Sequence, residues 1–190
     1  MGNMGQMGLG IIGAGFMART YAEVATRYIR DGRLVAVAIG QRAAGLAADY
    51  HVAYEPTLID LLARDDVDAV IITTPEMAHL EQTRLAAAAG KHVLVEKPMA
   101  ANVADCDQMI TACREAGVML MVVQSQRFRG VHQRAKQLLE EGRIGPVRQI
   151  RHWTTLEAKW SVEVVNDRPW YLSPEGGGLF MGQCVHNFDM

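Results

Sequence analysis

The sequence has 190 residues and a formal net charge of −2, and 49% of its residues are hydrophobic and 21% charged. This length holds one domain with a real core, or one domain and part of a second, and the composition is that of a globular protein. Because no basic excess exists to hold a nucleic acid or an anionic membrane, an anionic ligand must be held by local geometry. We therefore expect neither a nucleic acid nor a membrane as a partner.

The cysteines and the N-terminal residues indicate a compartment. Cys106, Cys113 and Cys184 form no CxxC pair and leave an odd thiol, so we expect neither a disulfide framework nor a metal site. Residues 1–7 lack the charged head and apolar stretch of a signal peptide, and no apolar run is long enough to span a bilayer. These features predict a reducing cytoplasm as the location.

Short apolar runs alternate with segments of helical spacing from residue 9 to residue 123. Runs that are apolar on both faces are typical of parallel strands covered by helices. The predicted strands are residues 9–12, 34–39, 69–72, 92–95 and 118–123. The alternation predicts an α/β fold, a Rossmann-type doubly wound parallel sheet with right-handed crossovers.

Helical segments lie between these strands. The predicted helices are residues 16–29, 43–50, 57–64, 76–89 and 102–116. The expected inward positions of the first helix are Phe16, Ala22, Ala25 and Ile29. Thr57 is the expected N-cap of the third helix, and Gly90 and Gly117 end the last two.

The pattern changes after Val123. Residues 131–141 have the spacing of an amphipathic helix, and residues 147–156 alternate in polarity like a strand in a sheet with one wetter face. Residues 162–173 are typical of a loop. We therefore place a domain boundary near residues 124–130.

A glycine-rich turn, GAGFMA from Gly13, joins the first strand to the first helix as a GxGxxA motif. Gly13 permits the tight turn, Gly15 lets the backbone approach a pyrophosphate, and Ala18 keeps the helix close to the sheet. The helix N-terminus adds free N–H groups and about half a positive charge. This context favours dinucleotide binding over a plain strand–helix turn, with Phe16 and Met17 beside the cofactor.

The end of the second strand bears on the choice of cofactor. An acidic residue there would bind the ribose hydroxyls of NAD, but the segment from Ile39 to Arg42 has no carboxylate. Arg42, with Gln41 beside it, can meet the 2′-phosphate of NADP in a charge-assisted contact. The alternative is a solvated Arg42 at a helix start, so NADP is only slightly favoured over NAD.

Polar groups also follow the next two strands. The carboxyl ends of the strands in such a sheet line the crevice that binds the cofactor, so we expect these groups to lie there. Thr74 and Pro75 follow the third strand, and His79 lies either near the nicotinamide or in a capping or packing position. Glu96 and Lys97 follow the fourth strand, where the Lys97 ammonium can bind a substrate oxygen or form a structural pair with Glu96. The bend before a proline also makes the Lys97 peptide bond a candidate for the cis form.

Together these segments resemble the Gfo/Idh/MocA oxidoreductases, the relatives of glucose–fructose oxidoreductase, inositol dehydrogenase and dihydrodiol dehydrogenase. The EKP segment in this order is specific, whereas the glycine motif alone is not. The matching stretches are GLGIIGAGFMA from Gly8, VDAVIITTPEMAHL from Val67, AGKHVLVEKPMA from Ala89, GRIGPV from Gly142, RPWYLSPEGGG from Arg168, and His186 before Asp189.

The resemblance implies an NAD(P)-binding Rossmann domain over residues 1–123 and, over residues 124–190, the beginning of an incomplete open-sheet α/β domain. It implies that Lys97 contacts the reacting substrate oxygen and that His186 is the general acid/base, a role that suits an imidazole. The substrate is then a sugar, cyclitol or dihydrodiol, and the full-length form is a homo-oligomer.

Two departures from the family pattern stand out. Many members have an aspartate four residues before the histidine, where this sequence has Gly182. Gln183 resembles the variant of some dihydrodiol dehydrogenases, so an amide binds the substrate in its place. Family members are also much longer than a chain that ends at Met190, which predicts a cofactor-binding fragment with little or no activity.

The leading hypothesis is a dehydrogenase that moves hydride between nicotinamide and a secondary alcohol or ketone. A non-catalytic NAD(P)-binding sensor or regulator is a second class, although the presence of both Lys97 and His186 argues against it. A glycoside hydrolase that uses NAD transiently is a third.

Overall fold

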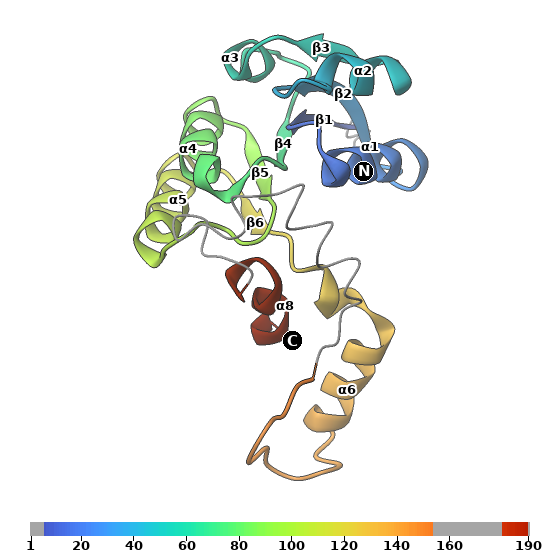
Figure 1. Cartoon of the computed structure of the whole chain (residues 1–190), viewed down its shortest axis with the longest axis vertical. Coiled ribbons are helices and arrows are strands. Elements are labelled where there is room, and N and C mark those ends of the chain that lie inside the picture. Colours follow the sequence, from blue (N-terminus) through green and yellow to red (C-terminus); the bar gives the residue numbers. More distant parts are fainter. Residues whose placement is uncertain (1–5, 154–179, 190) are drawn as a thin grey trace, which may run out of the picture. The chain divides into compact units, whose positions relative to one another are not determined.

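The computed structural model describes residues 6–153 and 180–189 of the chain (Figure 1). The chain divides into two compact units, Met1–Val123 (unit 1) and Gln124–Met190 (unit 2). None of the helices in the described ranges has both the length and the apolarity needed to span a bilayer.

Unit 1 contains a six-stranded parallel sheet in the order β3-β2-β1-β4-β5-β6. The order reverses between β1 and β4, and such a reversal opens a crevice at the carboxyl ends of the strands. The predicted α/β doubly wound fold is therefore confirmed. The strands are β1 (Met7–Ile12), β2 (Gly32–Ala38), β3 (Ala53–Glu55), β4 (Ala69–Ile72), β5 (His92–Val95) and β6 (Leu120–Val122).

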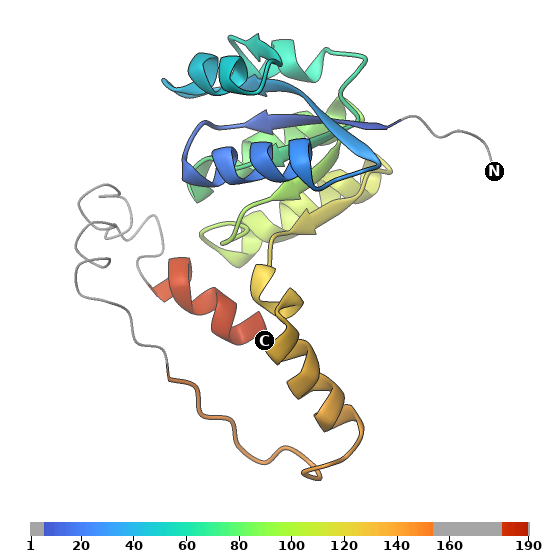
Figure 2. The same cartoon turned by 90° about the vertical axis from the view of Figure 1, so that its right-hand side faces the viewer.

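Helices cover both faces of this sheet (Figures 1 and 2). Two begin with side-chain caps, since Thr57 accepts a hydrogen bond from the Asp60 N–H and Asn102 accepts one from the Asp105 N–H. The helices are α1 (Phe16–Arg27), α2 (Ala43–Asp49), α3 (Leu58–Leu62), the 3₁₀ turn η1 (Glu76–Ala78), α4 (His79–Ala88) and α5 (Val103–Glu115).

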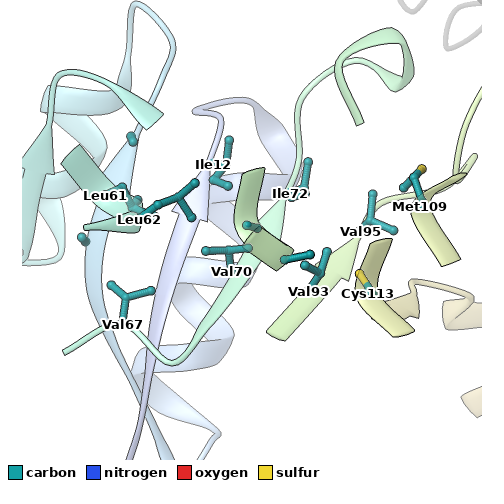
Figure 3. Close-up of a cluster of buried hydrophobic side chains, with 14 of the residues drawn as sticks. Ile12, Leu61, Leu62, Val67, Val70, Ile72, Val93, Val95, Met109 and Cys113 are labelled. Atoms are coloured by element: carbon teal, nitrogen blue, oxygen red, sulfur yellow. The ribbon is translucent and has the colours of Figure 1, made fainter. Parts of the chain in front are cut away.

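The core lies in two layers, one on each face of the sheet. In the first, Ile12 and Ile72 contribute to a cluster with residues of α3, α4 and α5, including the buried Cys113 (Figure 3). In the second, Ile11 and Ile71 belong to a cluster with α1 and α2. Successive strand residues thus enter opposite layers, which is why the sequence runs are apolar without alternation.

Two expectations about unit 1 need correction. Strand β3 was not predicted, because this short, partly exposed strand carries no apolar run. Phe16 is 73% exposed and Ile29 is also exposed, so neither is an inward position of the first helix. The buried side of α1 is made of Ala18, Ala22 and Ala25, whose small side chains let the helix lie close to the sheet.

Unit 2 contains the 3₁₀ turn η2 (Ser125–Phe128), α6 (Gly130–Glu140), the π-helical turn η4 (Phe180–Cys184) and α8 (Val185–Asp189). The Arg127 guanidinium donates two hydrogen bonds to the Asp189 carboxylate, which joins η2 to α8. This pair fixes the end of the helical segment that carries His186.

The strand predicted at residues 147–156 is wrong over residues 147–153, which form no regular structure. Trp153 is 87% exposed there. A strand needs a neighbouring strand to pair its N–H and C=O groups, and the described residues provide none for this segment. The rest of that prediction and the loop at residues 162–173 lie outside the described residues.

Replacing Met109 by alanine tests whether α5 closes the first core layer. Met109 is 0% exposed, so Met109→Ala leaves a cavity and lowers the free energy of unfolding by about 2–5 kcal/mol. The matched control is Ile110→Ala on the same helix, where a 48% exposed side chain predicts a loss of about 0.5 kcal/mol or less. Urea unfolding measures both, and equal losses would contradict the described packing of α5.

Candidate functional site

The glycine turn after β1 is sterically fixed. Gly13 has a φ angle of +112°, and a Cβ atom on it would lie 2.5 Å from the Thr73 Oγ1 atom, so only glycine fits. The Gly13 N–H donates to the Ala38 carbonyl at 2.9 Å. The turn is thereby held between the ends of β2 and β4, at the point where the strand order reverses.

The start of α1 is open. Gly15 is the N-cap residue, no side chain caps the helix, and the first turn has no acidic residue. A Cβ atom on Gly15 would meet no atom within 4 Å. The first N–H groups of a helix lack intrahelical partners, so this end can bind an anion through its backbone. Phe16 and the partly exposed Met17 flank it.

The end of β2 turns back toward the glycine loop. Ile39 has a φ angle of +63°, which is strained for a β-branched residue, and Gly40 follows at +107°. A Cβ atom on Gly40 would lie 3.3 Å from the Cβ atom of Ala14. Because of this close approach, the exposed Gln41 and Arg42 stand at the carboxyl end of β2, beside the glycine turn.

The segment after β4 is held by side-chain hydrogen bonds. The Thr73 hydroxyl donates to the Ile12 carbonyl at 3.0 Å, and the Thr74 hydroxyl donates to the buried Gln82 Oε1 atom at 2.5 Å. Pro75 is exposed. The end of β4 is thus tied to β1 on one side and to α4 on the other.

His79 is buried, with 1% of its surface exposed. Its Nδ1 atom lies 3.2 Å from the Pro98 carbonyl oxygen and 3.1 Å from that of Met99, and its Nε2 atom lies 2.8 Å from the Thr74 carbonyl oxygen. The imidazole therefore joins the segments after β4 and β5. This is the packing position that the sequence left as one of two alternatives.

Glu96 is a buried carboxylate at the end of β5. Its Oε1 atom accepts a hydrogen bond from the Tyr21 hydroxyl at 2.5 Å, and its Oε2 atom accepts one from the Lys97 backbone N–H at 2.9 Å. The Lys97–Pro98 peptide bond is cis, the form for which the sequence made it a candidate. Burial, together with the hydrogen bond and charge of Glu96, raises the pKa of Tyr21, so the phenol remains a donor.

Sequence reasoning missed Tyr21. Its spacing offered a signal, since Tyr21 lies three residues after Ala18 and next to Ala22, on the inward side of α1. Its partner Glu96 is 75 residues away, and no local pattern connects the two.

Most of the predicted site residues of unit 1 lie around the edge of the sheet formed by the carboxyl ends of the strands. Direct contacts link Gly13 to the β4 segment, His79 to the β4 and β5 segments, and Glu96 to α1. Gln183 and His186 belong to unit 2, in η4 and α8, where both are partly buried and Gly182 is buried. Within residues 6–153 and 180–189, no group of three or more His, Cys, Asp or Glu could hold a metal ion.

A parallel sheet that reverses order beside a glycine turn and an uncapped helix N-terminus defines a dinucleotide-binding Rossmann domain. Comparison with protein families agrees. Residues 7–124 match the oxidoreductase family with an NAD-binding Rossmann fold, and residues 132–190 match the GFO/IDH/MocA C-terminal domain. The chain belongs to the Gfo/Idh/MocA family of oxidoreductases.

Two relatives are named for small-molecule substrates. The chain is 35% identical over 188 residues to the 1,5-anhydro-D-fructose reductase of Ensifer adhaerens, an alignment that covers 95% of the chain and 54% of that protein. It is 31% identical over 189 residues to the 1-carboxy-3-chloro-3,4-dihydroxycyclo hexa-1,5-diene dehydrogenase of Comamonas testosteroni, covering 97% of the chain and 46% of that protein.

A solved structure with a similar fold is the scyllo-inositol dehydrogenase of Lactobacillus casei with bound cofactor NAD(H) and scyllo-inositol. The TM-score is 0.85 at 26% identity, over 97% of the chain and 54% of that protein. The chain spans about half the length of these relatives.

Alanine substitutions at Gly13 and Gly15 test whether the first position excludes a side chain and the second has room for one. Gly13→Ala forces a Cβ atom against Thr73 at a positive φ, so we expect it to lower the free energy of unfolding by about 2 kcal/mol or more. In Gly15→Ala the added Cβ atom would have no atom within 4 Å. We expect the free energy of unfolding to fall by no more than about 1 kcal/mol, because alanine is a weaker N-cap residue than glycine. Thermal unfolding of both variants measures the difference, and a stable Gly13→Ala protein would contradict the described turn.

Proposed function

We propose that the protein is an NAD(P)-dependent dehydrogenase that moves hydride between nicotinamide and a secondary alcohol or ketone of a sugar, cyclitol or dihydrodiol. One observation carries this proposal. The open N-terminus of α1 and the fixed turn at Glu96 and Lys97 occupy the same carboxyl-end edge of the sheet. An anion site beside a cationic side chain at this edge suits a dinucleotide and a substrate oxygen.

The residues of unit 1 fit a dinucleotide. Gly13, Gly15, Phe16 and Met17 would hold the pyrophosphate, where a Cβ atom on Gly15 would fill the open approach. The exposed Gln41 and Arg42 would meet the adenine ribose, and Thr74, Pro75, Glu96 and Lys97 would line the nicotinamide end. His79 would contribute by holding together the segments that follow β4 and β5. The cofactor supplies the hydride acceptor, and the protein supplies orientation and electrostatics.

The chemistry at the substrate needs a proton acceptor and a positive charge. In alcohol oxidation the hydride leaves the carbinol carbon while His186 takes the hydroxyl proton, and the Lys97 ammonium stabilises the developing negative charge on that oxygen. The Gln183 amide would bind a second substrate hydroxyl, where Gly182 provides no carboxylate. Residues 1–123 would then be the cofactor domain, and residues 124–190 the beginning of the substrate domain.

The relatives favour the substrate class. One is named for 1,5-anhydro-D-fructose, one for a dihydroxylated cyclohexadiene, and one contains scyllo-inositol. These molecules share a ring with a hydroxyl or carbonyl group. A cytoplasmic location and a homo-oligomeric form stay predictions from the sequence.

Absorbance at 340 nm tests the proposed reaction with the full-length gene product. The probes are 1,5-anhydro-D-fructose with NADPH or NADH, and scyllo-inositol with NADP or NAD. We expect net oxidation or reduction of cofactor with at least one pair. Tight cofactor binding without turnover across a wider set of polyols would favour a sensor, and glycoside cleavage without net reduction would favour a hydrolase.

The role of Lys97 is tested in the same assay. We expect Lys97→Ala to lower kcat by about a hundredfold or more, because the charge on the reacting oxygen is then uncompensated. Cofactor affinity should stay within a few-fold, which fluorescence titration with NADPH measures. The control is Lys91→Ala. Lys91 lies just before β5, at the opposite end of this strand from Lys97, and its ammonium donates to the Arg64 carbonyl. Unchanged turnover of Lys97→Ala would make that residue structural.

Arg42 at the end of β2 bears on the preference for NADP or NAD. Since the turn after β2 presents Arg42 and no carboxylate, we expect tighter binding of NADP than of NAD. Arg42→Ala should weaken NADP binding by roughly 1–3 kcal/mol and leave NAD binding almost unchanged. Calorimetric titration of both cofactors measures this, and equal losses would show that Arg42 does not contact the 2′-phosphate.

A further inference from the structure

Lys97 follows a carboxylate whose two oxygens are both bound. Glu96 accepts the Tyr21 hydroxyl on Oε1 and the Lys97 backbone N–H on Oε2. From this geometry we infer that Tyr21 is a positioning residue for Lys97 and acts through the Glu96 side chain. The inference rests on the proposed role of Lys97 at the substrate.

The first step is the placement of the carboxylate. A buried carboxylate is costly unless hydrogen bonds replace its lost hydration. Tyr21 supplies such a bond from α1 at 2.5 Å. The pKa of Tyr21 is raised by burial and by the Glu96 hydrogen bond, so the phenol keeps its proton and donates. The Tyr21 hydroxyl therefore selects one rotamer of Glu96.

The second step leads from the carboxylate to the backbone of Lys97. With Oε1 held by Tyr21, Oε2 is directed at the Lys97 N–H, 2.9 Å away. The Glu96 N–H donates to the Ile72 carbonyl at 2.9 Å, which holds the preceding peptide in the sheet. The following carbonyl, that of Pro98, faces the His79 ring. Lys97 thus lies between two fixed segments, and Tyr21 acts through the Glu96 side chain on the peptide that joins Glu96 to Lys97.

The third step concerns what this bond connects. Tyr21 belongs to α1, whose N-terminus at Gly15 is the proposed pyrophosphate site. One hydrogen bond therefore links the helix that holds the cofactor to the turn that carries Lys97. If the Tyr21–Glu96 hydrogen bond served stability alone, its loss would affect β5 as a whole. If it positions Lys97, its loss would affect the Lys97 N–H more than the neighbouring amides, and amide exchange measures this difference.

The test is hydrogen exchange in Tyr21→Phe, which keeps the ring and removes only the hydroxyl. A hydrogen bond to a charged group contributes about 1.5–3 kcal/mol, so we expect the Lys97 amide to exchange about tenfold to a hundredfold faster. The amides of Val93 and Val95 in β5 should keep their wild-type rates. NMR-detected exchange of the cofactor-free chain gives each rate.

A matched control is Tyr50, the residue after α2, which bonds to a glutamate of α1. The Tyr50 hydroxyl donates to the Glu23 side chain of α1 at 3.0 Å, a tyrosine–glutamate bond of the same chemistry elsewhere in unit 1. Tyr50→Phe should leave the exchange rate of Lys97 unchanged. An unchanged Lys97 rate in Tyr21→Phe, or an equal rise at Lys97, Val93 and Val95, would overturn the proposal.

A second variant covers the case in which Tyr21→Phe does not fold. Glu96→Gln keeps an oxygen for the Tyr21 hydroxyl but turns an NH₂ group toward the Lys97 N–H. We expect faster exchange at Lys97 with protection retained at Val95, and an unchanged Lys97 rate would again overturn the proposal.

Kinetics distinguish failure of this inference from failure of the proposed function. With 1,5-anhydro-D-fructose and NADPH, Tyr21→Phe should lower kcat about tenfold, while the KM for NADPH stays within about twofold. If Lys97→Ala leaves turnover unchanged, the proposed role of Lys97 fails whatever the exchange rates show. If Lys97→Ala abolishes turnover and Tyr21→Phe changes neither kcat nor the Lys97 amide, only the positioning role fails.

Discussion

The close approach of Gly13 to Thr73 is the constraint on which the rest of unit 1 depends. There β1 turns into α1 directly beside the end of β4, and a Cβ atom on Gly13 would lie 2.5 Å from the Thr73 hydroxyl oxygen. Because the turn is this tight, α1 begins at the edge where the sheet reverses its order. Its uncapped N-terminus then faces the crevice in which Rossmann domains bind dinucleotides.

Around this turn, the segments that follow β4 and β5 are held by polar contacts to other parts of unit 1. Thr73 is tied to β1, His79 joins the segments after β4 and β5, and Glu96 is tied to α1 by Tyr21. These groups are buried or partly buried, whereas Gln41 and Arg42 are exposed. Lys97, which is proposed to contact the substrate, follows a strand end that is held in this way, and a rigid support favours accurate orientation.

Family membership and geometry support each other at different levels. The family matches place the chain in an oxidoreductase family with an NAD-binding Rossmann fold, and the relatives described above are named for or contain small ring compounds. The geometry adds which side chains of unit 1 lie at the carboxyl-end edge of the sheet and how they are held. In unit 2, the ion pair between Arg127 and Asp189 gives the segment of His186 a defined anchor.

The sequence by itself determined most of the sheet, the glycine turn and the cofactor edge. Apolar runs and the spacing after Gly13 are local signals, so β1, β2, β4, β5 and β6 could be predicted from them. Only the tertiary structure decided the partners of Glu96 and His79, because those contacts join residues distant in the chain. It also decided β3 and residues 147–153, since a short or amphipathic strand exists only where a neighbour pairs with its backbone.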